Sequence, residues 1–247
     1  MKKENKYKIP YILNSRCIGL KNYKHLALFL IGFLGLTVIS LIVTTIIGAI
    51  NGLDYLNTTN GYTIITLISY FILFCILILI LFKDSLYILK SLINPKEIFL
   101  GLIFAGLLIS ITSIYNAFIF NLGITSNLNQ ATVEEVALNS PFFSFIILGI
   151  IGPICEELTY RVGLFGIIRK YNRLASYIAS SVIFGLLHFS LVDFTLNSFI
   201  NELLNLPSYI ISGLILTIAY EKGGFTSCIV AHMFNNILSM YYILFLG

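Results

Sequence analysis

The sequence predicts an all-α fold, a polytopic membrane helical bundle of about seven spans. Hydrophobic residues make up 58% of the 247-residue chain and charged residues only 11%, whereas a soluble globular domain carries about 25% charged residues. So few charges cannot cover a core in water, which excludes the soluble, disordered and nucleic-acid-binding classes. Several uncharged runs also reach the roughly 20 residues that a spanning helix needs.

The seven spans are expected where apolar runs are long and nearly free of charge. An eighth helix, short or re-entrant, is an alternative for the apolar stretch 194–206, and the third run is long enough for one span and an apolar outer loop. The runs are residues 26–50, 61–82, 98–133, 141–168, 174–192, 207–220 and 223–247.

The distribution of Lys and Arg predicts which ends of the spans face the cytoplasm. Fourteen of the fifteen Lys and Arg residues fall in residues 2–24, 83–96, 169–173 and at Lys222, and the alternate connections contain none. Cytoplasmic loops are the ones enriched in Lys and Arg. We therefore expect a multi-pass protein of the cell membrane, with a cytoplasmic N-terminus and with anionic lipid headgroups as partners rather than nucleic acid. His25, at the inner boundary of the first span, is expected at the interface.

The fifteenth cation, Arg161, lies inside the fourth span together with Glu156 and Glu157, and His188 and His232 lie inside later spans. Each charge near the bilayer centre costs at least about 2.5–3.5 kcal/mol. Such residues are rare in spans and mark functional sites, so this set predicts one.

Spacing along the helices predicts different roles for these residues. Glu157 and Arg161 are four apart with the acid first, which favours an ion pair on one helix face. Glu156 is turned about 100° away and remains available for proton transfer. Two further pairs are also four apart and share a helix face, Phe184 with His188 and His232 with Asn236.

The four polar candidates are also expected at a common depth. At 1.5 Å per residue, they lie roughly 14–21 Å from the inner ends of their spans. The candidates are Glu156, His188, His232 and Asn236. Three separate spans therefore contribute to one layer near the middle of the bilayer.

A carboxylate, two imidazoles and an amide favour water activation. Burial raises the pKa of a carboxylate and suits it to general acid–base chemistry, and an imidazole and an amide can donate hydrogen bonds to an oxyanion. Metal-assisted hydrolysis is the alternative, since Glu156, His188 and His232 are a plausible zinc triad, although HExxH is absent. A proton-coupled transporter could use the same Glu and His residues as a relay.

Three motifs in order resemble the CAAX-protease and bacteriocin-processing (CPBP, or Abi) family of intramembrane proteases. They are Glu156-Glu157-x-x-x-Arg161, Phe184-x-x-x-His188 and His232-x-x-x-Asn236, within residues 141–240. Pro153-Ile154 before the Glu pair is also similar to the family. One position departs from it: Val162 follows the Arg where Gly is common, and Gly163 comes one residue later.

The resemblance implies a cavity open toward the cytosol and a metal-free mechanism. Glu156 would be the general base acting with His188, and His232 and Asn236 would donate to the oxyanion. Glu157, Arg161 and Phe184 would support them. The expected organisation is a cytoplasmic basic arm (1–25), three N-terminal spans (26–140) and the catalytic core (141–247).

The resemblance also bears on the substrate, which would be a membrane-associated peptide or protein. The composition, rich in Lys, Ile and Asn, is typical of a low-GC bacterium, where the family is linked to pheromone or bacteriocin processing and to self-immunity. A non-catalytic immunity or scaffold protein is therefore a further alternative.

Overall fold

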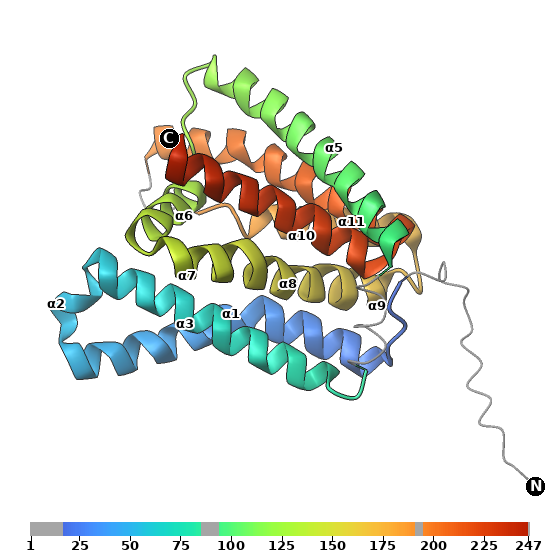
Figure 1. Cartoon of the computed structure of the whole chain (residues 1–247), viewed down its shortest axis with the longest axis horizontal. Helices are drawn as coiled ribbons and strands as arrows, with labels where there is room; N and C mark the ends of the chain where they lie inside the picture. Colours follow the sequence, from blue (N-terminus) through green and yellow to red (C-terminus); the bar gives the residue numbers. More distant parts are fainter. Residues whose placement is uncertain (1–16, 85–93, 191–194, 247) are drawn as a thin grey trace, which may run out of the picture.

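Every regular element in the part of the chain that the computed structural model describes, residues 17–84, 94–190 and 195–246, is a helix (Figure 1). The all-α class is therefore confirmed. In order, the elements are α1 (Asn22–Asn51), α2 (Leu53–Leu56), α3 (Thr59–Leu81), α5 (Pro95–Phe120), α6 (Leu128–Asn139), α7 (Pro141–Ile146), the π-helix η1 (Ile147–Ile151), α8 (Gly152–Glu157), the π-helix η2 (Leu158–Phe165), α9 (Gly166–Ile168), α10 (Arg173–Leu186) and α11 (Leu196–Phe245).

Five helices among the described residues are long and apolar enough to cross a membrane. They support a multi-pass membrane protein, while the expected count of about seven spans is not confirmed. α10 has only 14 residues, and the end of its predicted span, residues 191–192, lies outside the described residues, as do residues 1–16 of the basic arm. The five helices are Asn22–Asn51, Thr59–Leu81, Pro95–Phe120, Pro141–Ile168 and Leu196–Phe245.

α11 consists of two helical legs that meet at Gly224. The backbone there has φ 77° and ψ −172°, a conformation that glycine adopts without steric cost. The predicted sixth and seventh spans are thus the two legs of one broken helix. Residues 196–206 are the first turns of the first leg, so they do not form the separate eighth helix considered as an alternative.

The predicted outer loop after the third span is in part a helix. α5 ends at Phe120, and α6 begins at Leu128 because Asn127 caps it, accepting a hydrogen bond from the Gln130 backbone N–H. Asparagine is among the preferred N-cap residues.

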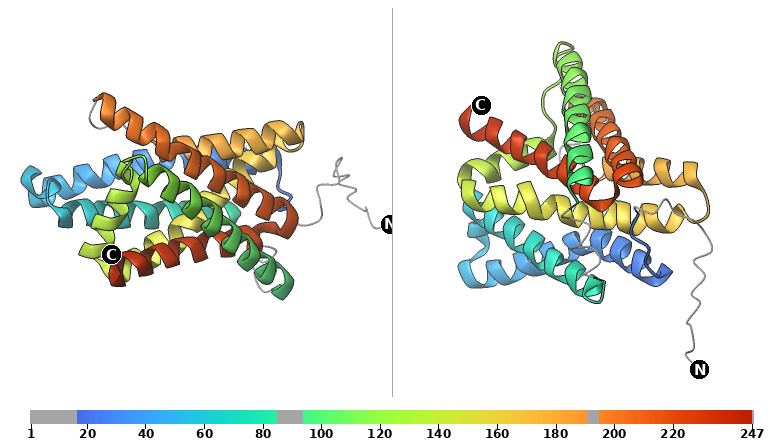
Figure 2. Two further views of the ribbon diagram at one scale, coloured as in Figure 1. Left: turned by 90° about the horizontal axis from the view of Figure 1, so that it is seen from above. Right: turned by 45° about the vertical axis from the view of Figure 1, so that its right-hand side comes forward.

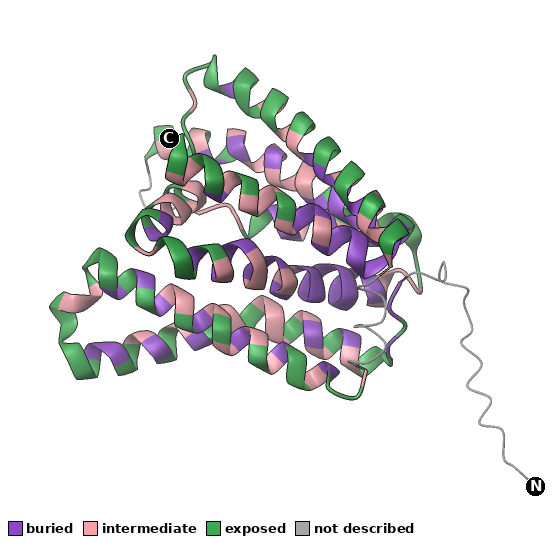
Figure 3. Ribbon diagram, viewed as in Figure 1, coloured by how far each residue is buried: buried purple, intermediate pink, exposed green. Residues whose placement is uncertain are grey.

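The helix formed by residues 141–168 runs through the middle of the bundle. α1 and α3 pack together on one side of it, and α5, α10 and α11 lie on the other (Figures 1 and 2). Buried residues concentrate along α8 and η2 (Figure 3). One hydrophobic core therefore joins α1 and α3 to the C-terminal half of the chain.

α1 approaches η2 closely, and this contact corrects the expectation for His25. Its side chain is fully buried rather than interfacial: Nε2 accepts a hydrogen bond from the Leu20 backbone N–H, so Nδ1 is left to donate to the Val162 carbonyl. A Cβ on Gly163 would lie 2.7 Å from the Phe29 backbone nitrogen. Gly163, one position after the place where Gly is common in the family, therefore allows α1 to pack against η2.

Gly163→Ala is expected to lower the free energy of unfolding by about 1–3 kcal/mol, the usual cost of overpacking, because backbone atoms cannot move aside as a flexible side chain can. Unfolding of the purified protein in mixed micelles measures this. Gly106→Ala is the matched control, since a Cβ there meets nothing within 4 Å. Equal stability of the two variants would contradict the packing argument.

Candidate active site

The backbone around Glu156 departs from a regular α-helix. α8 lies between two π-helical segments, and the Gly152 N–H bonds to the Ile147 carbonyl five residues back. In that register the Leu148 carbonyl would accept from residue 153, but Pro153 has no N–H. The Asn236 side-chain amide donates to this carbonyl instead, at 3.1 Å. Asn236 thus ties α11 to the π-helix, a feature frequent at functional sites.

Glu157 is buried in a network of charges. Its Oε1 accepts hydrogen bonds from Arg161 Nη1 at 3.1 Å and from His232 Nδ1 at 2.8 Å. Both Glu157 and Arg161 are fully buried. The ion pair expected from their spacing is present, and it also holds the ring of His232.

Phe184 and Gly213 complete the surroundings of Arg161. Its Nη2 donates to the Gly213 carbonyl at 3.1 Å, and its guanidinium carbon lies 4.5 Å from the centre of the Phe184 ring. A cation is stabilised over an aromatic face. The Phe184 ring therefore contacts the buried charges, and it also lies next to the ring of His188.

Glu156 points away from Arg161, as the helix spacing predicts. Its Oε2 is buried and has no hydrogen-bond partner among the described residues. The nearest basic atom is His232 Nε2, 3.7 Å away. The distance is too long for a direct hydrogen bond, so the carboxylate is free to bind a water molecule or a substrate.

His188 lies beyond the end of α10 rather than inside a helix. Its Nδ1 lies 2.8 Å from the Phe184 carbonyl, and its ring stacks on Tyr209 with centroids 4.5 Å apart. A carbonyl only accepts, so Nδ1 carries the proton and Nε2 of the neutral ring is an acceptor. The ring is also 4.8 Å from that of Phe184, which keeps the predicted pair in contact although the helix has ended.

One cavity of about 160 Å³ is lined by all four residues expected at a common depth. They are Glu156, His188, His232 and Asn236. Asn235 and Ser239 from α11 and Tyr70 from α3 also line it. The cavity therefore brings a carboxylate, two imidazoles and an amide to a common volume.

The geometry does not fit the alternative zinc triad as the side chains lie. Among the described residues, no three His, Cys, Asp or Glu side chains are placed to hold a metal ion. We therefore derive no step through a metal.

Residues that position the His188 loop were missed by the sequence analysis. Asn127 Nδ2 donates to the His188 carbonyl at 2.8 Å, and Asn127 Oδ1 accepts from Tyr209. Glu202, a charged residue within the apolar stretch 194–206, is buried and accepts from the backbone N–H groups of Leu128 and Ser190. Most of these contacts join residues more than 60 positions apart, and the Glu202–Ser190 contact joins residues 12 positions apart. The spacing of residues along one helix therefore does not indicate them.

Comparison with known proteins gives one family and one relative. Residues 138–238 match the family model described as Rce1-like, type II CAAX prenyl endopeptidase. An uncharacterized protein of Mycoplasma capricolum subsp. capricolum is 35% identical over 103 residues, which cover 40% of this chain and 27% of the relative. The match thus spans about a quarter of that relative's length. No solved structure matches the chain. The matched residues contain all three motifs, so the resemblance of this part of the chain to CAAX proteases is confirmed.

Proposed function

We propose that this chain is an intramembrane endopeptidase that hydrolyses a peptide bond of a membrane-associated peptide or protein with a water molecule activated by Glu156. The observation that supports this most is the arrangement of charge at the cavity. Arg161 and His232 hold Glu157, while Glu156 lines the cavity and its Oε2 has no hydrogen-bond partner among the described residues.

Glu156 is the general base in this proposal. Its carboxylate takes a proton from water as the oxygen bonds to the substrate carbonyl carbon, and a tetrahedral oxyanion forms. The proton then passes to the leaving nitrogen as the C–N bond breaks. Positioned acid–base catalysis of this kind contributes about 10²–10⁴-fold to a rate.

His232 is the proposed main donor to the oxyanion. Glu157 only accepts, so His232 Nδ1 donates to it, and a second proton on Nε2 would make the ring a cation. With that second proton, Nε2–H could donate to an oxyanion in the cavity that His232 lines.

His188 serves the proton transfer. Its Nε2 accepts, because Nδ1 is engaged with the Phe184 carbonyl. The lone pair on Nε2 lies in the same cavity as Glu156, so Nε2 can accept the proton that Glu156 took from water and pass it on to the departing amine. The stacking on Tyr209 keeps the ring in one orientation.

Asn236→Ala is expected to reduce kcat about 10²-fold or more, the usual cost of one oxyanion donor, because its second amide hydrogen is available to the cavity. It should also lower the free energy of unfolding by about 1–3 kcal/mol, since the buried Leu148 carbonyl loses its donor. Cleavage rates and unfolding curves measure the two effects separately. Asn60→Ala is the control, because Asn60 is exposed, accepts a 3.1 Å bond from Asn139 and lines neither this cavity nor the larger one described below. An Asn236→Ala enzyme with an unchanged rate would leave the residue a structural role only.

Metal removal is expected to leave cleavage unchanged. Dialysis of active protein against a chelator should change the rate less than about twofold, with zinc below one atom per chain, because no three His, Cys, Asp or Glu side chains among the described residues are placed to hold a metal ion and the proposed base works without one. Elemental analysis with a parallel rate assay checks this. Stoichiometric zinc whose removal abolishes activity would favour the metalloprotease alternative.

Comparative peptidomics of cells carrying the wild type or Glu156→Gln tests the function and names the substrate. Peptides that depend on Glu156, among them pheromone or bacteriocin precursors, would support the proposal. Proton or solute movement in liposomes without cleavage would favour a transporter. Immunity that survives loss of Glu156 would favour a non-catalytic partner.

A further inference from the structure

A second, larger cavity adjoins the catalytic one. Its volume is about 660 Å³, within the range of roughly 300–1,000 Å³ of ligand pockets. It lies between α5, both legs of α11, the 121–127 connection and the start of α6. Both cavities share the lining residues Gln130, Tyr209, Ser212, Asn235 and Ser239, so they lie directly next to each other. We call the larger one the α5–α11 groove.

The lining of the α5–α11 groove mixes polar and apolar side chains and carries no charge. It combines hydroxyl and amide groups with isoleucine, leucine and phenylalanine side chains and contains no Asp, Glu, Lys, Arg or His, whereas one Glu and two His line the catalytic cavity. Thr112, Ser113 and Asn116 of α5 face Asn205, Ser208 and Ser239 of α11 across it. Neutral donors and acceptors of this kind match a peptide backbone.

The catalytic residues can reach the scissile peptide bond only when the substrate polypeptide is extended around it. An extended substrate no longer pairs its own backbone N–H and C=O groups as a helix does. At membrane depth each unpaired group costs several kcal/mol. The hydroxyl and amide side chains of the groove can pair with them. A charged substrate side chain would find no counter-ion there, so the same lining disfavours Lys, Arg, Asp and Glu.

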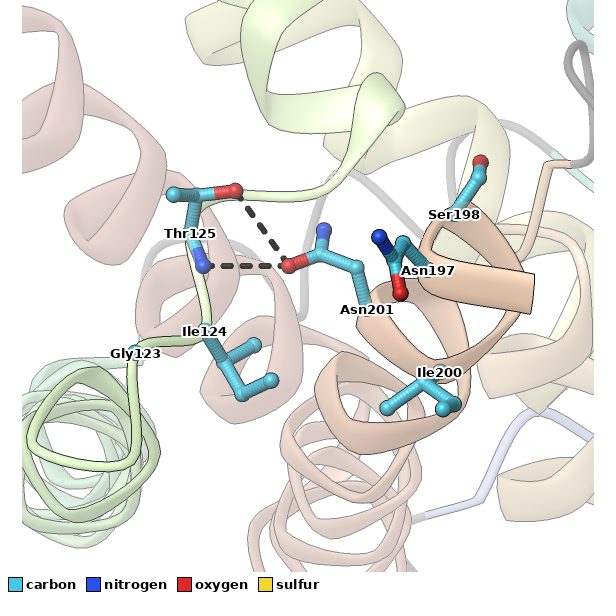
Figure 4. Close-up of a pocket in the computed structure, with 7 residues that line it drawn as sticks. All are labelled: Gly123, Ile124, Thr125, Asn197, Ser198, Ile200 and Asn201. Carbon is cyan, nitrogen blue, oxygen red and sulfur yellow. Dashed lines mark hydrogen bonds between the residues drawn. The ribbon is translucent and has the colours of Figure 1, made fainter. Parts of the chain in front are cut away.

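The groove reaches the end of the bundle that carries no Lys or Arg among the described residues. Its rim is held in place, because Asn201 Oδ1 accepts from the Thr125 backbone N–H and hydroxyl (Figure 4). Asn205 also donates to the Thr125 carbonyl. The rim pocket of Figure 4 shares Ile124 and Thr125 with the groove. The resemblance implied an opening toward the basic, cytoplasmic side, whereas this opening lies at the opposite end.

We propose that the α5–α11 groove holds an extended, uncharged stretch of the substrate polypeptide on one side of the scissile bond, entering from the end opposite the basic loops. The inference rests on the proposed function. It assigns substrate selection to α5, which lies outside the family-matched residues 138–238.

A plug in the groove is the first test. Asn116→Cys is modified with a bulky maleimide in liposomes, and cleavage of a proteome-derived peptide mixture is followed by mass spectrometry. Ser110→Cys is the matched control, since Ser110 is exposed on the same helix but does not line the groove. Modification should slow cleavage about tenfold or more at Asn116 and less than twofold at Ser110. Wild type treated with the same maleimide controls for the native cysteines. Cys155 and Cys228 are buried, and burial raises the pKa of the Cys17 thiol to about 12. The reagent therefore reacts mainly with Cys75 in the wild type.

The cleaved sequences are the second test. Wild-type products should lack charged residues on one side of the cleavage site, and Asn116→Asp should accept Lys there about tenfold better. No cleavage by wild type would overturn the proposed function itself. If wild type cleaves peptides, but neither modification of Asn116→Cys nor the Asn116→Asp substitution changes the cleavage, the proposal that the groove binds substrate would be overturned and the proposed function would stand.

Discussion

Glu156→Gln is expected to reduce peptide cleavage about 10²–10⁴-fold while the protein accumulates in the membrane at its normal level. The amide has nearly the shape of the carboxylate but cannot take a proton from water. Stability should change little, because Oε2 has no hydrogen-bond partner to lose among the described residues. Turnover of a peptide named by peptidomics, measured with purified protein in liposomes, gives the size of the effect.

Glu135→Gln is the matched control for Glu156→Gln. Glu135 is an exposed carboxylate on α6 that accepts a hydrogen bond from Thr59, so the same chemical change occurs away from the catalytic cavity. Its rate should stay within about twofold of wild type. If both variants cleave at the wild-type rate, the base is another group.

Arg161→Leu is expected to lower the free energy of unfolding by about 3–5 kcal/mol, the cost of leaving a buried charge without its partner. Glu157 would lose its arginine partner and keep the bond from His232, and the Gly213 carbonyl would lose the donor from Arg161. The double variant Glu157→Gln/Arg161→Leu should recover part of this loss, because no buried carboxylate remains unpaired. Unfolding in mixed micelles measures all three proteins.

Arg173→Leu is the control for Arg161→Leu. Arg173 is largely exposed, and its partner Glu221 keeps a 2.6 Å bond to Arg169. We expect a change below about 1 kcal/mol, as for surface ion pairs. An Arg161→Leu protein as stable as Arg173→Leu would show that the buried network does not hold the site together.

Local patterns in the sequence predicted the parts of the fold that depend on local chemistry. Apolar runs located the long helices, and the spacing of Glu157 and Arg161 predicted their ion pair. The spacing of Phe184 and His188 indicated contact, although the helix ends before His188. The catalytic roles of Glu156, His188, His232 and Asn236 stay predictions.

The features that the sequence did not predict depend on contacts between distant segments. Pro153 removes a donor inside a helix, but only the folded chain shows that Asn236 replaces it. Glu202 has the charge of a loop residue, yet its carboxylate is buried because two backbone N–H groups point at it. The sequence places His25 at the end of an apolar run and so predicted a position at the interface. Its burial results from the close approach of α1 to Gly163 and Gly166, which only the folded chain shows.

Hydrolysis in H₂¹⁸O tests the central claim that Glu156 activates a water molecule for peptide-bond cleavage. Purified wild type and Glu156→Gln in liposomes are incubated with the peptide mixture, and the products are analysed by mass spectrometry. We predict new carboxyl termini that carry one ¹⁸O atom with wild type and none above background with Glu156→Gln. Products that form equally with both proteins, or no product with wild type, would contradict the account.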